Sequence, residues 1–112
     1  MNVTNIFTCY TFFVETLFSY GTLTDPEIQK RIVGRELSGQ KDFLSGYDLS
    51  SVIIEGVVFP CAIPSRNGKV SGMVYQITID ELVKVDDYEG KEYRRKKVSL
   101  SSGHDAWVYV RA

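Results

Sequence analysis

The chain has 112 residues, of which 44% are hydrophobic and 24% are charged. This composition is typical of one globular domain, because two separate cores in so short a chain would each be too small to be stable alone. Thirteen basic and fourteen acidic side chains leave a formal net charge of −1. The sequence therefore offers no broad cationic field, and we predict neither a nucleic-acid nor a membrane partner.

Few of the residue types that usually carry out chemistry are present. Cys9 and Cys61 lack the spacing of a metal or redox motif, and the single histidine is His104. We predict no metal site and no disulfide framework, with both cysteines as small core residues. His104 is expected to be an exposed turn residue. Catalysis by this chain would therefore use carboxylates, hydroxyls and backbone groups.

The first fifteen residues are unusually apolar and aromatic between Ile6 and Val14. The first basic residue is Lys30, which argues against the cationic leader of a signal peptide. Polar residues interrupt the run before it reaches the roughly 20 residues that a membrane-spanning helix needs. β-branched and aromatic residues favour an extra strand, and a tail that binds a partner, for example in a homodimer, is the alternative. We expect a cytoplasmic location.

A short buried strand is predicted over residues 17–20, followed by a helix. Proline disfavours helical angles in the residue before it, so Asp25 is predicted as the N-cap and Pro26 as the first helical residue. Gly34 is expected to end this helix, because glycine readily adopts the left-handed conformation found at helix ends.

The middle of the chain is predicted to consist of strands. Residues 43–49, 52–59 and 70–78 are rich in β-branched and aromatic side chains. Asn67-Gly68 is a strong hairpin signal, so a turn is predicted there. Gly72, inside the third of these strands, indicates a bulge or the close approach of another part of the chain.

A second helix and a closing hairpin complete the predicted elements. Asp80 is the expected N-cap of a helix that runs to about Tyr88, and residues 94–100 and 106–111 are expected to pair. Strands joined mostly by short turns, with two short helices, predict an α+β fold. We expect a small mixed, largely antiparallel β-barrel.

Two places depart from a purely structural pattern. In Tyr20-Gly21-Thr22-Leu23, a glycine before a helix lets backbone N–H groups approach and bind an anionic group, although Gly21 could simply make the turn. Glu89 lies seven residues after Leu82 and four after Val85, on the inward face of the second helix. Partial burial would raise the pKa of its carboxyl toward the range of a general acid/base. The alternative is that Glu89 is a solvated turn residue.

Three segments in this order carry a resemblance to a known family. They are Leu17-Phe18-Ser19-Tyr20-Gly21-Thr22-Leu23, Val70-Ser71-Gly72-Met73-Val74-Tyr75-Gln76-Ile77, and Val85-Asp86-Asp87-Tyr88-Glu89-Gly90 with the following Tyr93. Together they resemble the gamma-glutamylcyclotransferase-like family, and most of all its short, bacterial-type members. The resemblance assigns residues 16–112 to one domain of this family and leaves residues 1–15 as an N-terminal extension.

The resemblance implies a small β-barrel with helices packed on it and a cavity beside the Tyr-Gly-Thr-Leu loop. It implies an enzyme of the acyltransferase or lyase type, which cyclises a small-molecule γ-glutamyl amide to 5-oxoproline and releases an amine without a cofactor. By residue match, Glu89 would be catalytic, and the substrate-binding residues would be Tyr20, Gly21, Thr22, Leu23 and Tyr93. The alternative is a non-catalytic small-molecule-binding or protein-interaction module on the same scaffold.

Overall fold

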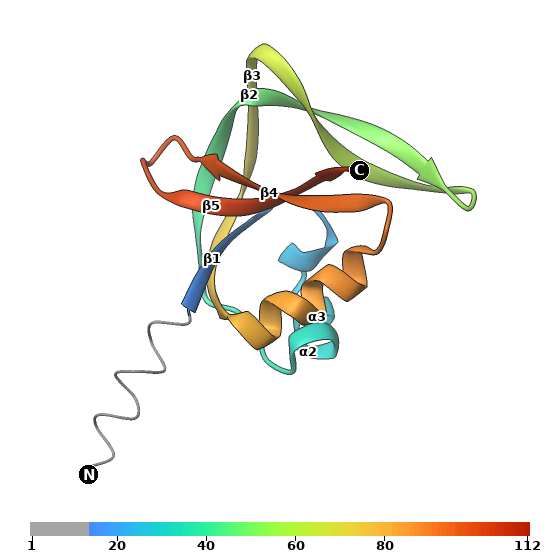
Figure 1. Cartoon of the computed structure of the whole chain (residues 1–112), viewed down its shortest axis with the longest axis vertical. Helices are drawn as coiled ribbons and strands as arrows, with labels where there is room; N and C mark the ends of the chain where they lie inside the picture. Colours follow the sequence, from blue (N-terminus) through green and yellow to red (C-terminus); the bar gives the residue numbers. More distant parts are fainter. Residues whose placement is uncertain (1–13) are drawn as a thin grey trace.

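The computed structural model describes residues 14–112 of the chain. Within these residues, five strands form one curled sheet in the order β2-β3-β1-β5-β4 (Figure 1). The strands are β1 (Val14–Ser19), β2 (Gly39–Ile54), β3 (Val57–Thr78), β4 (Tyr93–Ser99) and β5 (Asp105–Arg111). β1 and β5 are parallel, and the other neighbouring strands are antiparallel. The expected α+β fold with a mixed sheet is confirmed, in the form of a half-barrel. The prediction of an extra strand or tail before Val14 lies outside the described residues.

The helices lie together on one side of the sheet (Figure 1). A short 3-10 turn, η1 (Thr22–Thr24), precedes helix α2 (Pro26–Val33). As predicted, the Asp25 side chain caps α2 by accepting a hydrogen bond from the Glu27 N–H, and the helix ends at Gly34 with φ +87°. In the described part of the chain, no helix has the length and apolar character that crossing a membrane requires.

Helix α3 (Ile79–Glu89) begins two residues earlier than the sequence predicts. The N-cap is Thr78, not Asp80, and it forms a capping box with Glu81. The Thr78 hydroxyl accepts from the Glu81 N–H at 3.1 Å, and the Glu81 carboxylate accepts from the Thr78 N–H at 2.9 Å. Thr78 is the N-cap in place of Asp80 because this reciprocal pair of hydrogen bonds satisfies two N–H groups at once. Asp80 lies in the first helical turn instead.

Two apolar clusters fill opposite faces of the sheet, because successive side chains of a strand point in opposite directions. Leu17 belongs to a cluster with Leu82 and Val85 of helix α3, which attaches the helices to the sheet. Its neighbour Phe18 belongs to a second cluster with Leu44 and Val108, built from strands and the β4–β5 turn. The curl of the sheet therefore encloses a core of its own.

The longest hairpin, β2–β3, turns at Glu55-Gly56 and not at Asn67-Gly68. Residues 52–59, predicted as one strand, therefore contain the turn: Ile54 pairs with Val57, and both turn residues have positive φ (50° and 79°). That conformation defines a two-residue hairpin turn, in which glutamate is an uncommon residue. In Figure 1 this hairpin arches over the sheet and extends beyond it.

Asn67-Gly68 lies inside β3, where the pairing with β2 shifts register between Ser45 and Tyr47. A Cβ atom on Gly68 would overlap the Tyr47 carbonyl oxygen, so glycine is required there by a close approach of two strands. Gly72 likewise faces Ser19, whose carbonyl oxygen would lie 2.5 Å from an added Cβ. Of the two alternatives for Gly72, close approach is therefore the one observed, since its pairing with β2 is regular at this point.

Candidate active site

The loop Tyr20–Leu23 follows β1 and is held in place by hydrogen bonds and by a buried side chain. Leu23 is buried in the core, and the Gln29 side chain of α2 donates a hydrogen bond to its carbonyl oxygen at 2.8 Å. The Gly21 carbonyl oxygen accepts from the Thr24 N–H at 3.1 Å and from the Thr24 hydroxyl at 2.8 Å. Gln29 was not among the residues that sequence reasoning selected, although a glutamine on an inward helix face was a signal for such a role.

The backbone N–H groups of Gly21 and Thr22 donate no hydrogen bond to any residue in the range 14–112. Gly21 has a φ of −121°, which any residue can adopt, so glycine is not needed here to make the turn. A Cβ atom at Gly21 would lie 3.4 Å from the Pro60 ring. The glycine therefore keeps the space between the loop and β3 open, with two N–H donors beside it.

Glu89 is the last residue of α3, one turn beyond Val85, which is fully buried. Burial raises the pKa of the Glu89 carboxyl from 4.5 to about 7. Within residues 14–112 no hydrogen bond or ion pair engages this carboxyl. Glu89 is therefore a partly desolvated acid, and both its protonated and its ionised forms are populated at neutral pH.

The loop and Glu89 line one cavity of about 260 Å³. Its walls come from β1 and the following loop, the end of the β2–β3 hairpin, the end of α3, and β4 and β5. The lining residues are Phe18, Ser19, Tyr20, Gly21, Thr22, Ile54, Phe59, Pro60, Tyr88, Glu89, Glu92, Tyr93 and Tyr109. Among these residues of the described chain, the charged side chains are two carboxylates, Glu89 and Glu92, and there is no cation.

Tyrosine hydroxyls tie the walls of the cavity together. The Tyr20 hydroxyl donates to the Tyr109 carbonyl oxygen at 2.7 Å and accepts from the Ala62 N–H at 3.0 Å. The Tyr93 hydroxyl donates to the Pro60 carbonyl oxygen at 2.9 Å. A hydrogen bond also joins the Thr22 and Tyr88 hydroxyls. The tyrosines thus form a rigid aromatic lining.

Burial is the main cause that raises the pKa of three of these tyrosines: Tyr20, Tyr93 and Tyr109. The negative charge of Glu89 raises these pKa values further. Their hydroxyls therefore stay protonated at neutral pH and act as donors. The Tyr20 and Tyr93 hydroxyls donate their hydrogen bonds to backbone carbonyl oxygens. Their rings can therefore contact a ligand, while the hydroxyl protons stay bound to the protein.

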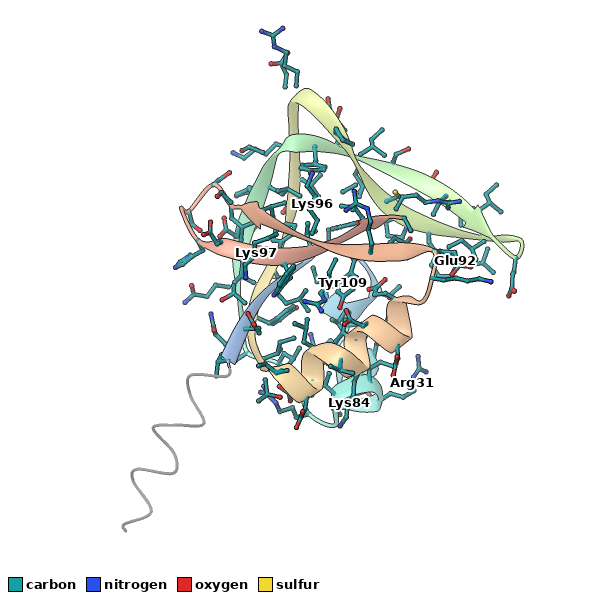
Figure 2. The ribbon with its side chains drawn as sticks, viewed as in Figure 1. Arg31, Lys84, Glu92, Lys96, Lys97 and Tyr109 are labelled. Atoms are coloured by element: carbon teal, nitrogen blue, oxygen red, sulfur yellow. The ribbon has the colours of Figure 1, made fainter. Side chains whose placement is uncertain are left out.

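A network that the sequence analysis did not select lies behind the cavity. Asp86, one turn before Glu89, accepts two hydrogen bonds from the Arg95 guanidinium of β4, at 2.7 and 3.1 Å. The Tyr109 hydroxyl of β5 donates to the same carboxylate at 2.5 Å. Figure 2 shows Tyr109 between the strands and helix α3, whereas Glu92 lies where α3 leads into β4. Asp86 lies four residues after Leu82, on the same face of the helix, but its partners follow only from the strand order.

The structure therefore brings together five of the six residues that the sequence predicted for the site: Tyr20, Gly21, Thr22, Glu89 and Tyr93. Leu23 does not line the cavity, because its side chain is 1% exposed and packs in the core beneath the loop. Cys61 is buried and His104 is exposed, as expected, whereas Cys9 lies outside the described residues. Among residues 14–112, no three histidine, cysteine or acidic side chains gather closely enough to hold a metal ion.

The family model described as "Gamma-glutamyl cyclotransferase, AIG2-like" matches residues 17–112, and the chain belongs to this family. AIG2-like protein C of Arabidopsis thaliana is 38% identical over 85 residues, which is 75% of this chain and 48% of that protein. AIG2-like protein D of the same plant is 33% identical, over 78% of this chain and 57% of that protein. The chain thus spans about half the length of these plant relatives.

Solved structures share the fold. A solution structure from Arabidopsis thaliana superposes with a TM-score of 0.75 at 28% identity, covering 88% of this chain and 69% of that one. A structure titled "Gamma-glutamyl cyclotransferase" has a TM-score of 0.72 at 16% identity, covering 88% of this chain and 67% of that one. The same fold forms 17% of the Kluyveromyces lactis allophanate hydrolase, with a TM-score of 0.71 at 14% identity and 88% of this chain covered.

Proposed function

We propose that this protein is a γ-glutamyl amide cyclotransferase, with Glu89 as the general acid/base. The observation that carries the proposal is a single cavity that holds a partly desolvated glutamate and two backbone N–H groups without an internal acceptor. Family membership supports the same activity. The substrate would be a small γ-glutamyl amide, and the cytoplasmic location expected from the sequence stays a prediction.

The reaction needs no nucleophile from the protein, because the substrate carries its own. The α-amino nitrogen attacks the γ-carbonyl carbon, the bond from that carbon to the amide nitrogen breaks, and 5-oxoproline forms as the amine leaves. The α-ammonium group loses two protons in total, and the departing amine takes up two and leaves as an ammonium ion. Holding one molecule in a folded conformation supplies the proximity that a reaction of two molecules would lack.

Glu89 is suited to carry these protons. With a pKa of about 7, the carboxylate can accept a proton from the α-ammonium group, and the resulting acid can donate it to the leaving nitrogen. General acid/base catalysis of this kind contributes about 10²–10⁴-fold to a rate. The Gly21 and Thr22 N–H groups would bind negative charge, either on the substrate carboxylate or on the oxyanion, where a well-placed donor contributes roughly 3 kcal/mol.

The test is product formation from a panel of γ-glutamyl amines and γ-glutamyl dipeptides, with 5-oxoproline measured by mass spectrometry. We expect Glu89→Gln to lower kcat by about 10²-fold or more. Asp87→Asn, an exposed carboxylate in the same helical turn, is the matched control and should retain activity. Equal turnover in the Glu89→Gln variant and the wild type would remove Glu89 from the mechanism. Stabilisation by 5-oxoproline without turnover would favour the non-catalytic binding module.

A further inference from the structure

Tyr109 connects the two halves of the candidate active site through two different groups. Its hydroxyl donates to the Asp86 carboxylate at 2.5 Å, one turn before Glu89 on helix α3. Its backbone carbonyl oxygen accepts from the Tyr20 hydroxyl at 2.7 Å, next to Gly21 in the loop. One residue of β5 therefore contacts both the helix that carries the acid and the loop that carries the N–H donors.

Arg95 fixes the same helical turn from the neighbouring strand. Its guanidinium binds the Asp86 carboxylate through Nε and Nη2, and both side chains are about one-third exposed, at 28% and 35%. The guanidinium also lies over the Trp107 ring, 4.4 Å from its centre. A planar two-point contact that is also stacked on a ring restricts orientation far more than a single contact between point charges.

Glu89 itself has no such restraint. Its carboxyl forms no hydrogen bond or ion pair within the described residues 14–112, and the helix ends immediately after it at Gly90. The last turn is closed by the Gly90 N–H, which donates to the Asp86 carbonyl oxygen at 3.0 Å. The direction of the Glu89 side chain therefore depends on where Asp86 is held.

We propose that Tyr109, Asp86 and Arg95 form a positioning unit that holds the last turn of α3 so that Glu89 faces the Gly21–Thr22 loop. The catalytic role of this unit rests on the proposed cyclotransferase function. Its role in holding the position of Glu89 is independent of that function. The unit would act through Glu89, without contact between Asp86 or Arg95 and the substrate.

The consequence for the reaction follows from distance. A displacement of about 1 Å in a reacting group can lower a rate by about 10²-fold, because the reacting atoms no longer meet in line. A loosened last turn would also admit water to the Glu89 carboxyl and return its pKa toward the ordinary value. Water would enter a site whose other ionisable side chains are Tyr20, Tyr88, Tyr93, Tyr109 and Glu92.

Two variants remove the contacts of the unit: Tyr109→Phe, which keeps the ring, and Arg95→Gln, which removes the guanidinium. Each has a matched control elsewhere in the fold. Tyr47→Phe removes a buried tyrosine hydroxyl that accepts a hydrogen bond from the Lys96 ammonium at 2.9 Å in the other core cluster. Arg35→Gln removes a two-point pair with Glu81, at 2.7 and 2.9 Å, in the first turn of the same helix.

The deciding measurement is the pKa of Glu89 in each variant. It is followed by ¹³C NMR in protein labelled at the glutamate carboxyl carbon, with the Glu89 signal identified by its loss in Glu89→Gln. We expect this pKa to fall by about one pH unit or more in Tyr109→Phe and in Arg95→Gln, and to stay at the wild-type value in both controls. A pKa unchanged in either test variant, or lowered equally in the controls, overturns the inference.

Kinetics then connect the unit with catalysis. On a γ-glutamyl amide that the wild type converts, kcat should fall by about 10–100-fold in the two test variants, while KM changes much less. An unchanged kcat would refute the catalytic part of the inference. A wild type that forms no 5-oxoproline would refute the proposed function, and the NMR titration would still decide whether the unit positions Glu89.

Discussion

Replacing Glu89 with glutamine should stabilise the folded protein at alkaline pH and leave it nearly unchanged in acid. The pKa of the Glu89 carboxyl is 4.5 in its ordinary state and about 7 in the folded protein, because burial disfavours the ionised form. The folded chain therefore binds this proton more tightly than the unfolded chain. The resulting stability is fully present below pH 4.5 and is lost as the pH rises through about 7.

The size of the effect follows from the two pKa values. Each pKa unit corresponds to about 1.4 kcal/mol, so the raised pKa sets an upper limit of about 3 kcal/mol on the cost of ionising Glu89 in the folded state. Because Glu89 remains in contact with solvent at the cavity, water screens part of this cost. We therefore expect Glu89→Gln to raise the free energy of unfolding by about 1–3 kcal/mol above pH 8.

The assay is urea unfolding of the wild type, Glu89→Gln and Asp87→Asn at a series of pH values between about 4 and 9. The difference between Glu89→Gln and the wild type should be close to zero at the acid end and increase through neutral pH. Asp87→Asn should show no such rise. A difference between Glu89→Gln and the wild type that is independent of pH would refute the conclusion that burial controls this carboxyl.

Three further outcomes are expected. Because Glu89 must be ionised to accept the α-ammonium proton, kcat/KM should fall tenfold per pH unit below about pH 7. A kcat/KM that does not change between about pH 5 and 7 would contradict the proposed base. Because Thr78 is the N-cap of α3, Thr78→Ala should lower the free energy of unfolding by about 1 kcal/mol in urea titrations, and Asp80→Ala by less than half of that. A larger loss of stability in Asp80→Ala than in Thr78→Ala would contradict the assigned cap. Substrates whose leaving amine carries a carboxylate should be converted about tenfold less efficiently than uncharged analogues, because the charged groups of the cavity within residues 14–112 are both anionic. Glu92→Gln should reduce that preference, and an equal preference in both proteins would exclude Glu92 as its source.

Elements with a local cause were predictable from the sequence. The Asp25-Pro26 pair and Gly34 defined α2 correctly, because a cap, a fixed proline angle and a left-handed glycine act within a few residues. The spacing of Leu82, Val85 and Glu89 likewise placed the glutamate on the inward face of α3, where it lines the cavity.

Elements that depend on pairing between distant segments were not predictable in the same way. Asn67-Gly68 has the stronger local signal for a turn, yet β2 and β3 pair on both sides of it, and it lies at the irregularity between the two paired stretches. Glu55-Gly56 makes the turn although glutamate rarely adopts positive φ, since the apolar residues on either side pair with each other. The role of Tyr109 also depends on strand order, because only the sheet places β5 between β1 and β4.

The position of β1 in the sheet has a consequence for how the chain reaches its native state. β1 lies between β3 and β5, so the first of the five described strands borders the one of them that is synthesised last. Contacts so remote in sequence form slowly, because a long loop must close before they can contribute. Until β5 arrives, β1 keeps an unpaired edge of backbone groups that could join another chain. A ribosome-bound nascent chain lacking residues 105–112 should therefore bind chaperones and resist release.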